Sequence, residues 1–352
     1  MDLSHLRKKI DSVDSKIIRL LNDRAAIALS IGKEKIKNKK PIYAPDREQD
    51  VLKRIKDLNA GPIKNEAVEA IYREIMSASL ALEKPLRIAY MGPEATFSHL
   101  ASLKRFGSSV EHVACDNVAE VFNKVECGDC DYGVVPIENS IEGVVTHTMD
   151  LLVDSELKIC AQVLLDVTHN LMSKRALSQV KEVYSHPQVL GQCRQWLMKN
   201  MPKAHLISTV STTKAAQIVA NRKNAACIAS QVAASLYGLT ILKKNIQDRA
   251  HNITRFLVIS TTDTPPTAKD RTSLVFSIKD KVGALHAMLS PFMKNKINLT
   301  KIESRPSKKK AWDYYFFVDC EGHQSDPRVA RALTQLEGMC KFLKILGSYP
   351  DA

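Results

Sequence analysis

An apolar stripe along the first predicted helix contains two cations. The stripe follows spacings of three and four residues, as one face of a helix does, through Leu6, Ile10, Val13, Ile17, Leu20, Ile27 and Ile31. Arg24 occupies one position of this stripe, and Lys35 comes one turn after Ile31. A guanidinium that faces a core stays charged and needs a carboxylate or phosphate partner. The stripe therefore predicts either a dry pocket for an acidic small molecule or an internal ion pair.

Polar side chains of the next two predicted helices can reach the same interior. Arg47 and Glu48 precede apolar residues by helical spacings, so at least one of them is expected to face the core that Arg24 faces. Ser79 and Glu83 lie one turn apart on a third helix. The candidate site therefore comprises Arg7, Arg24, Lys35, Arg47, Glu48, Ser79 and Glu83. A salt-bridged helical surface is the alternative that spacing alone leaves open.

A second set of polar residues follows short apolar runs in the middle of the chain. It comprises Gly92–His99, Asn139 with Ser140, Ser185–Gln188 with Gln192, Ser211–Thr213 and Asn252–Phe256. Helix capping explains any one of these groups. Polar groups at several strand-to-helix junctions also suit a ligand site, because the junctions meet at one edge of a sheet.

A third set lies near the C-terminus. Gly283–His286 opens a predicted helix, and Glu303–Pro306 follows a predicted strand. A helix N-terminus suits the carboxylate of an amino acid, and an acidic side chain suits its ammonium group. The alternatives are a glycine that only permits close packing and a surface ion pair between Glu303 and Arg305.

The first segment, residues 1–84, is predicted to be all helix. A long helix ends before Pro41, a second runs from Pro45 to Leu58, and a third carries the apolar residues of Val68–Leu82. Three helices of such unequal length make a poor core for a single chain. The first helix is therefore expected to pack against a second copy of the chain.

The rest of the chain follows two other patterns. Residues 86–262 alternate short apolar strands with helices, which predicts an α/β domain with buried strands. After a predicted linker at Thr261–Lys269, residues 272–352 follow the order strand, helix, strand, strand, helix, strand of a ferredoxin-like α+β unit. The predicted fold class is thus multidomain, with an all-α, an α/β and an α+β part.

Composition and charge argue against several classes of protein. Of the 352 residues, 45% are hydrophobic and 25% are charged, which is ordinary for a globular chain, and no apolar run is long enough to span a membrane. The net charge of +13 is spread over all three segments, and its densest clusters are predicted loops, Lys33–Lys40 and Lys308–Lys310, which argues against nucleic-acid binding. The eight scattered cysteines are expected to be free thiols. The chain opens directly into helix without a signal peptide, which predicts the cytoplasm.

The first set of residues resembles the all-helical chorismate mutase family over essentially the whole segment. The matching stretches are Leu6–Asp11, Leu20–Arg24, Gly32–Lys35 and Asp46–Glu48. The resemblance implies a dimer with two sites, in which Arg24 and Arg7 of the partner subunit hold the carboxylates of chorismate. It also implies Lys35 at the ether oxygen, Arg47 and Glu48 at the ring hydroxyl, and Ser79 beside a carboxylate.

The chemistry implied by this family agrees with the residue types. Rearrangement of chorismate to prephenate is pericyclic and needs a compact conformer and stabilised charge on the ether oxygen, but no nucleophile. Ala44 stands where some members have Asp, so one contact to the ring hydroxyl is expected to be missing. Glu83 stands where many bacterial members have Gln, and only a protonated carboxyl can donate to the ether oxygen. Mutase activity is therefore expected to decline as the pH rises.

The second set, taken in order, resembles prephenate dehydratase over residues 86–262. The resemblance implies two α/β lobes with a cleft between them, similar in shape to periplasmic binding proteins, with the first lobe resuming near Arg255–Ile259. It places Thr254 beside the leaving hydroxyl and gives substrate-binding roles to Asn139, Ser140, Ser185 and Gln192. Arg255 is our candidate for binding a substrate carboxylate. Ala95 departs from the glycine that is common in the first loop of the family.

The third set resembles the phenylalanine-binding motifs of ACT domains: Gly283, Ala284, Leu285, His286, Glu303, Ser304, Arg305 and Pro306. ACT units commonly pair side by side, which implies an interface site and feedback inhibition by phenylalanine. Together the resemblances imply a bifunctional enzyme of phenylalanine biosynthesis that binds chorismate, prephenate and phenylalanine. They imply a homodimer or higher oligomer, with no cofactor, metal, nucleic acid or membrane involved. A catalytically idle amino-acid sensor is the alternative.

Overall fold

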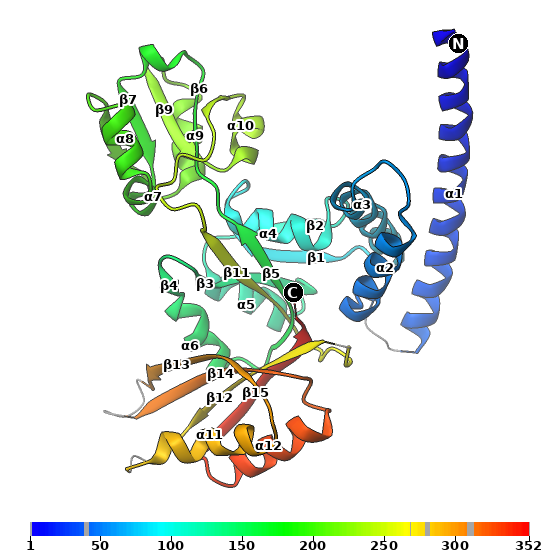
Figure 1. Cartoon of the computed structure of the whole chain (residues 1–352), viewed down its shortest axis with the longest axis vertical. Coiled ribbons are helices and arrows are strands. Elements are labelled where there is room, and N and C mark those ends of the chain that lie inside the picture. Colours follow the sequence, from blue (N-terminus) through cyan, green and yellow to red (C-terminus); the bar gives the residue numbers. More distant parts are fainter. Residues whose placement is uncertain (1, 39–41, 268, 279–281, 308–312, 352) are drawn as a thin grey trace. The chain divides into compact units, whose positions relative to one another are not determined.

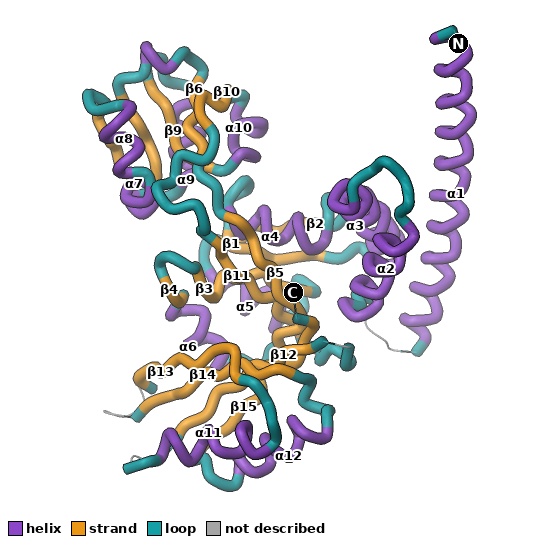
Figure 2. The backbone as a smooth tube through the Cα atoms, viewed as in Figure 1, coloured by secondary structure: helices purple, strands orange, loops and turns teal. Residues whose placement is uncertain are grey.

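The computed structural model describes residues 2–38, 42–267, 269–278, 282–307 and 313–351. From the predicted lysine clusters, Lys39, Lys40 and Lys308–Lys310 lie outside the described residues. The chain forms two compact units, Met1–Ile88 with Arg105–Glu111 and Ala89–Lys104 with His112–Ala352. Figure 1 labels the elements of each unit, and Figure 2 distinguishes helices, strands and loops.

The first unit is built on α1 (Leu3–Lys37), α2 (Pro45–Leu58) and α3 (Asn65–Glu83). Asp2 caps α1 by accepting a hydrogen bond from Ser4 N, and Pro45 opens α2, where its missing N–H is tolerated. α1 packs on α3 along a face that buries Ala28 and Gly32. The predicted order of three helices is confirmed.

The apolar stripe of α1 is exposed in the single chain. The exposed fractions of Ile10, Leu20 and Ile27 are 60%, 67% and 62%. The buried face of α1 runs instead through Ala28 and Gly32, which are offset by one position from the stripe and so are rotated around the helix. Within one chain the stripe therefore covers no core, and its packing against a second copy stays a prediction.

The first sheet of the second unit has the strand order β2-β1-β3-β11-β5, with β4 paired to β3. Its strands are β1 (Arg87–Met91), β2 (Glu111–Cys115), β3 (Tyr132–Asn139), β4 (Gly143–Val144), β5 (Lys158–Asp166) and β11 (Ile253–Ser260). The helices in this stretch of sequence are α4 (Phe97–Phe106), α5 (Val118–Glu126) and α6 (Thr146–Asp154). β11 lies between β3 and β5 and is antiparallel to both, so the predicted return of the chain to the first lobe is confirmed.

The second sheet has the order β10-β6-β9-β7-β8. Its strands are β6 (Asn170–Ser173), β7 (Glu182–Ser185), β8 (His205–Ser208), β9 (Ala225–Ala229) and β10 (Thr240–Lys243). The accompanying helices are η1 (Leu177–Gln179), α7 (Pro187–Gln192), α8 (Arg194–Asn200), α9 (Thr212–Val219) and α10 (Gln231–Tyr237). Residues 167–169 and 244–252 connect the two sheets, and they contact each other where Val167 N donates to Asn252 O at 2.7 Å.

The C-terminal part has the predicted strand and helix order, and its sheet runs β13-β14-β12-β15 with antiparallel pairs. Its elements are β12 (Asp270–Ser277), α11 (Ala284–Lys294), β13 (Leu299–Pro306), β14 (Tyr314–Glu321), α12 (Pro327–Glu337) and β15 (Phe342–Pro350). One face packs on its own helices through Phe276 and Phe292. The other face shares a hydrophobic core with the first sheet, in which Phe317 and Leu346 join Leu257. The C-terminal part is thus packed into the second unit rather than merely tethered by its linker.

The eight cysteines are thiols outside any disulfide, as predicted. Within the part of the chain that the structure describes, no helix is both long enough and apolar enough to cross a membrane.

Candidate functional site

The C-terminal ends of α1 and α3 bring Lys35 and Glu83 together. Lys35 Nζ lies 3.2 Å from Glu83 Oε2 and also donates to Ile42 O at 2.6 Å. The helices approach closely here, because a Cβ added at Gly32 would lie 2.8 Å from Glu83 Cγ. Gly32 is therefore required for the contact between Lys35 and Glu83. In the sequence, Gly32 was indicated only as part of the stretch Gly32–Lys35 that resembles chorismate mutases.

Arg24 and Ser79 form a second contact between the same helices. Arg24 Nη1 donates to Ser79 Oγ, and Ser79 Oγ donates its own proton to Ile75 O at 2.8 Å. Because Ser79 and Glu83 are one turn apart on α3, the two contacts are neighbours along that helix. The structure thus gathers two cations, a hydroxyl and a carboxyl between α1 and α3, as the sequence predicts.

The first turn of α2 contributes Glu48. Its Oε2 lies 3.2 Å from Tyr43 OH, which donates to it, and 3.1 Å from Arg105 Nη2. The Glu48 side chain is largely buried whereas Arg47 is exposed, so Glu48 is the inward-facing member of the predicted pair. Tyr43 and Arg105 were not predicted, because neither shares a helical spacing with the other candidates.

Arg7 is exposed and does not join this group within one chain. It lies on the same straight run of α1 as Arg24, and a rise of 1.5 Å per residue puts the two about 25 Å apart along the helix axis. No rotamer of an arginine side chain spans that distance.

Thr254 and Asn139 face each other across β11 and β3, where they are register partners. Asn139 Oδ1 accepts hydrogen bonds from Ile141 N at 2.9 Å and Glu142 N at 3.0 Å, which fixes the orientation of the amide. Asn139 Nδ2 therefore faces Thr254 and donates to its Oγ1 at 2.8 Å. Since Thr254 Oγ1 accepts this bond, the Thr254 proton is available to a different acceptor.

The hydrogen-bond network continues from Asn139 toward Gln192. Asn139 Nδ2 also donates to Asn252 Oδ1 at 2.7 Å, and Asn252 Nδ2 donates to Gln192 Oε1 at 3.2 Å. Gln192 Nε2 donates to Glu142 Oε1 at 2.8 Å, which fixes this amide because a carboxylate only accepts. Glu142 and Gln192 line an open pocket of about 710 Å³, a size that suits a small metabolite.

His169 ends the network on the far side of Gln192. Its Nε2 lies 2.7 Å from Gln192 Oε1, an acceptor, so the neutral ring carries its proton on Nε2. Nδ1 is buried without a hydrogen-bond partner among the described residues, and burial lowers the pKa of His169. Asn252 and His169 lie in the two segments that connect the sheets. Asn252 had a signal, since it belongs to the predicted group Asn252–Phe256; His169 had none.

Two serines of the predicted dehydratase site form hydrogen bonds with backbone groups. Ser140 Oγ accepts from Ile253 N at 2.9 Å and so ties the end of β3 to β11. Ser185 is fully buried at the end of β7, where its Oγ donates to Ile228 O at 2.7 Å. The structure therefore brings Asn139, Gln192 and Thr254 into one network but leaves Ser185 outside it.

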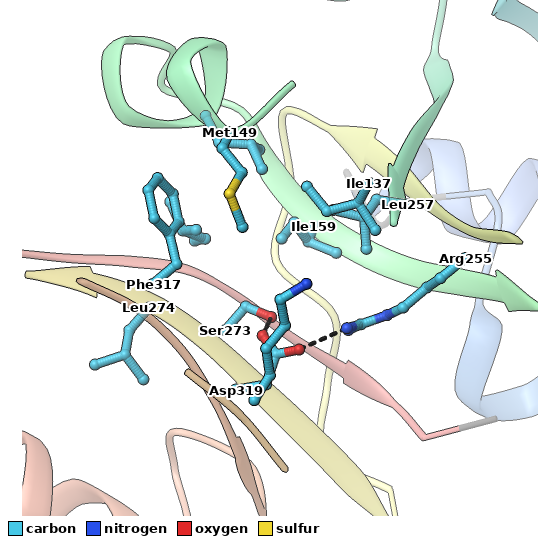
Figure 3. Close-up of a pocket in the computed structure, with 12 residues that line it drawn as sticks. Ile137, Met149, Ile159, Arg255, Leu257, Ser273, Leu274, Phe317 and Asp319 are labelled. Carbon is cyan, nitrogen blue, oxygen red and sulfur yellow. Dashed lines mark hydrogen bonds and ion pairs between the residues drawn. The ribbon is translucent and has the colours of Figure 1, made fainter. Parts of the chain in front are cut away.

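Arg255 points away from Thr254, because consecutive strand residues face opposite sides. Its guanidinium donates to Gln162, Asp319 and Tyr349 through Nε, Nη1 and Nη2 at 2.8, 2.6 and 2.8 Å. Figure 3 shows Arg255 reaching Asp319 beside a small cavity of about 20 Å³ between the two parts of this unit. All three nitrogens are occupied by protein groups. The structure therefore gives no support to the expectation that Arg255 binds a substrate carboxylate.

The first loop after β1 contains a strained backbone. Ala95 adopts φ +63, in the left-handed region that favours glycine. Glycine is the residue that prephenate dehydratases commonly have at this position. Ala95 N donates to His99 Nδ1 at 3.1 Å, and Ser230 Oγ of the second lobe donates to Ala95 O at 2.9 Å. Burial, together with the nearby His112, lowers the pKa of His99.

The C-terminal motifs occupy one helix start and one edge strand. Gly283 has φ +76, and an added Cβ would meet nothing within 4 Å, so backbone conformation rather than close packing explains the glycine. Ala284 is buried, whereas Leu285 and His286 are exposed. On β13, Glu303 is half-buried, and Ser304 and Pro306 are exposed.

Arg305 forms its ion pair with Asp150 of α6 rather than with Glu303. The two nitrogens Nε and Nη2 of Arg305 lie 3.1 and 3.2 Å from the two carboxylate oxygens of Asp150. This bidentate contact holds β13 against the first lobe of the same unit.

Comparison with known families covers most of the chain. The family model for chorismate mutase type II matches residues 6–84, the model for prephenate dehydratase matches residues 88–264, and the model for the ACT domain matches residues 272–338. The three matches follow one another in the order that the sequence predicted.

Similar proteins match over nearly their whole length. A bifunctional chorismate mutase/prephenate dehydratase of Aquifex aeolicus (strain VF5) is 49% identical, over 100% of this chain and 98% of the relative. One from Escherichia coli (strain K12) is 31% identical, over 98% and 95%. The solved prephenate dehydratase of Arthrobacter aurescens in complex with L-Phe is 32% identical with a TM-score of 0.70, over 76% of this chain and 90% of that one. This chain therefore belongs to the family of bifunctional chorismate mutase/prephenate dehydratases.

Proposed function

We propose that the helical unit rearranges chorismate to prephenate at the cluster around Lys35 and Glu83. The reaction breaks the ether C–O bond and forms a C–C bond within the substrate, so the protein supplies only conformation and charge. Lys35 and a protonated Glu83 donate to the ether oxygen as negative charge grows there. Arg24, oriented by Ser79, binds a carboxylate, and Glu48 accepts from the ring hydroxyl.

This mutase site is completed by a second copy of the chain. Arg7 is too far along α1 to join Arg24 in the same chain, and it is exposed beside the apolar stripe, next to Leu6. Pairing two α1 helices along the stripe would bury the apolar side chains and bring Arg7 of the partner subunit to the second substrate carboxylate. We therefore propose a homodimer as the smallest active mutase.

The second unit converts prephenate to phenylpyruvate, water and carbon dioxide through Thr254. The ring C–OH bond breaks as the hydroxyl takes a proton, and the C–CO₂⁻ bond breaks to give its electron pair to the aromatic ring. Thr254 Oγ1 donates the hydrogen bond to the leaving hydroxyl. Asn139 stabilises the growing negative charge on Thr254 Oγ1, and Gln192 binds substrate from the pocket wall.

The observation that carries this proposal is the direction of the hydrogen bond between Asn139 and Thr254. An isolated threonine is a poor acid, and an amide N–H that donates to its oxygen makes the hydroxyl a better donor. Two backbone N–H groups fix the Asn139 amide in the orientation that this role needs.

Phenylalanine inhibits the dehydratase through the C-terminal part. The start of α11 offers free backbone N–H groups for the carboxylate of the amino acid, and Glu303 offers a partner for its ammonium group. The relative from Arthrobacter aurescens was solved with L-Phe, which supports phenylalanine as the effector. The shared core of this part with the first sheet gives a physical route toward β11.

One assay tests both activities and their regulation. The full-length chain is given chorismate, and prephenate and phenylpyruvate are measured with and without excess phenylalanine, together with the melting temperature. We expect phenylpyruvate to form, less of it to form with phenylalanine, and the melting temperature to rise with phenylalanine. Accumulation of prephenate would contradict the Thr254 site, and an unchanged melting temperature would contradict the effector site.

The idle-sensor alternative is not favoured, because the relatives that match over their whole length are named as enzymes. We place the reactions in the cytoplasm, and the eight thiols support this, since thiols stay reduced there.

A further inference from the structure

Glu48 of the helical unit is held by a cation from outside the helical segment. Arg105 lies in the last turn of α4, in the stretch that matches prephenate dehydratase, yet residues 105–111 belong to the helical unit. Arg105 Nη2 lies 3.1 Å from Glu48 Oε2, and the two side chains are only 16% and 13% exposed. The guanidinium also lies over the ring of Tyr43, with 5.4 Å between Arg105 Cζ and the ring centroid.

The segment that carries Arg105 is fixed on α3 by several contacts. Ser108 donates to Glu74 through both its N and its Oγ, and Ser109 N donates to Ser77 Oγ at 3.0 Å. Gly107 has φ +71, and an added Cβ would lie 2.4 Å from Ser77 Cβ. A residue other than glycine is excluded there both by conformation and by space.

Aromatic packing fixes the Glu48 side of the contact. The rings of Tyr43 and Phe106 have centroids 4.9 Å apart, and Tyr43 is almost fully buried. Tyr43 OH and Arg105 Nη2 both end on Oε2 of Glu48. Both contacts therefore hold the carboxyl through Oε2, one from a neutral hydroxyl and one from a cation.

We propose that Arg105 is a positioning residue of the mutase site, which fixes the Glu48 carboxyl through Oε2 so that Oε1 accepts the hydrogen bond from the ring hydroxyl of chorismate. The inference rests on the proposed function of Glu48. It means that the mutase site extends beyond the helical segment and takes an essential cation from the dehydratase part of the sequence. Arg105 does not touch substrate and acts through Glu48.

A double-mutant cycle in the full-length chain tests this. We compare Arg105→Met, Glu48→Gln and the double variant by mutase kcat and KM for chorismate, with dehydratase turnover of supplied prephenate as the internal control. Arg105→Met is expected to lower mutase kcat/KM about ten- to a hundredfold, the loss of one charge-assisted hydrogen bond, and to spare the dehydratase. In the Glu48→Gln background the same substitution is expected to change little, because its target is already neutral.

Two further variants separate positioning from folding. Arg105→Lys keeps the charge without the planar fork and is expected to recover part of the activity. Ser108→Ala loosens the same segment from Glu74 without touching Glu48, and it is expected to leave mutase turnover within about twofold. An equal loss from Arg105→Met in both backgrounds, or a loss from Ser108→Ala as large as that from Arg105→Met, would overturn the proposal.

Failure of the underlying site has a different signature. Lys35→Ala must abolish mutase turnover if the cluster between α1 and α3 is the active site at all. Retained turnover in Lys35→Ala would refute the proposed site and, with it, the role of Arg105. Lost turnover in Lys35→Ala with full turnover in Arg105→Met would refute only the role of Arg105.

Discussion

The two units solve the problem of a polar site in opposite ways. In the helical unit, the long helix α1 exposes its apolar stripe. One predicted substrate-binding residue, Arg7, lies far from the other residues of the mutase site. In the second unit, Thr254 and its partners come from strands of one sheet and from the segments that connect two sheets, all within one chain.

This difference follows from the geometry of the elements. α1 has 35 residues whereas α2 has 14 and α3 has 19, so α1 extends past the core that the three helices share, and its residues are expected to serve two chains. Antiparallel strands place partners such as Thr254 and Asn139 directly opposite each other, so a site can be built without a second chain. Variants should therefore be complementable between chains in the helical unit and not in the second unit.

The largest effect is expected for Thr254→Ala. Removing the hydroxyl removes the proposed hydrogen-bond donor to the leaving group, and dehydratase kcat should fall about a thousandfold. Mutase turnover should be unchanged, because Thr254 belongs to the other unit. Separate assays with chorismate and with prephenate measure the two rates.

Thr254→Ser is the matched control, since it keeps the hydroxyl and should keep most of the dehydratase activity. Equal loss of both activities in Thr254→Ala would contradict separate sites. Restoration of dehydratase activity by mixing two inactive dehydratase variants, Thr254→Ala and Asn139→Leu, would contradict a site contained in one chain.

The next largest effect is expected for the two arginines of the mutase site. Arg7→Ala and Arg24→Ala should each lower mutase kcat/KM at least about a hundredfold, because each removes a carboxylate partner. Mixed after dissociation and reassociation, the two inactive variants should recover about a quarter of the wild-type activity, since half of the dimers carry one intact site. Mutase assays on the mixture and on each variant alone measure this.

Arg19→Ala provides a matched control on the exposed surface of α1, and it should behave as the wild type when assayed alone. No recovery in mixtures that do exchange subunits would mean that Arg7 and Arg24 do not share a site across chains.

Much of the fold could be predicted from local pattern. The spacing of apolar residues located α1 to α3, and short apolar runs located β1, β3, β9 and β11. The shared core between the C-terminal part and the first sheet could not be predicted, because Phe317 and Leu346 look like ordinary strand residues. Their packing partner depends on which face of the C-terminal sheet is covered by another part of the chain, and tertiary structure determines this.

The candidate sites divide in the same way. Asn139, Gln192 and Thr254 stand in recognisable groups, and the structure brings them into one network. The partners of Arg255 could not be predicted, because a strand turns consecutive side chains to opposite faces, and adjacency to Thr254 therefore gives no information about them. Arg105 could not be predicted, since its contact with Glu48 depends on how the end of α4, far away in the sequence, packs on the helical unit.

A smaller effect concerns the pH dependence of the mutase. Glu83 can donate to the ether oxygen only when it carries a proton, and it faces Lys35 at 3.2 Å. Mutase kcat/KM should therefore decline as the pH rises, by up to about tenfold per pH unit once Glu83 is ionised, and Glu83→Gln should remove the decline. The dehydratase pH profile, measured on the same variant, should not change. An unchanged mutase profile in Glu83→Gln would show that another group causes the decline.

The smallest effect tests the buried network of the second unit through stability. Burial lowers the pKa of His169 below its ordinary value near 6.5, so below that pH the unfolded chain binds a proton that the folded chain does not. The free energy of unfolding should therefore fall on acidification, and His169 should account for at most about 1 kcal/mol of the fall between pH 6.5 and 5.5. His169→Gln keeps a donor to Gln192 but does not titrate, so denaturant unfolding of the second unit should show a smaller fall. His99, whose pKa is also lowered, leaves a residual dependence that His169→Gln cannot remove. A fall in His169→Gln equal to that of the wild type would mean that His169 is not neutral in the folded chain, and the proposed direction of its hydrogen bond to Gln192 would lose its basis.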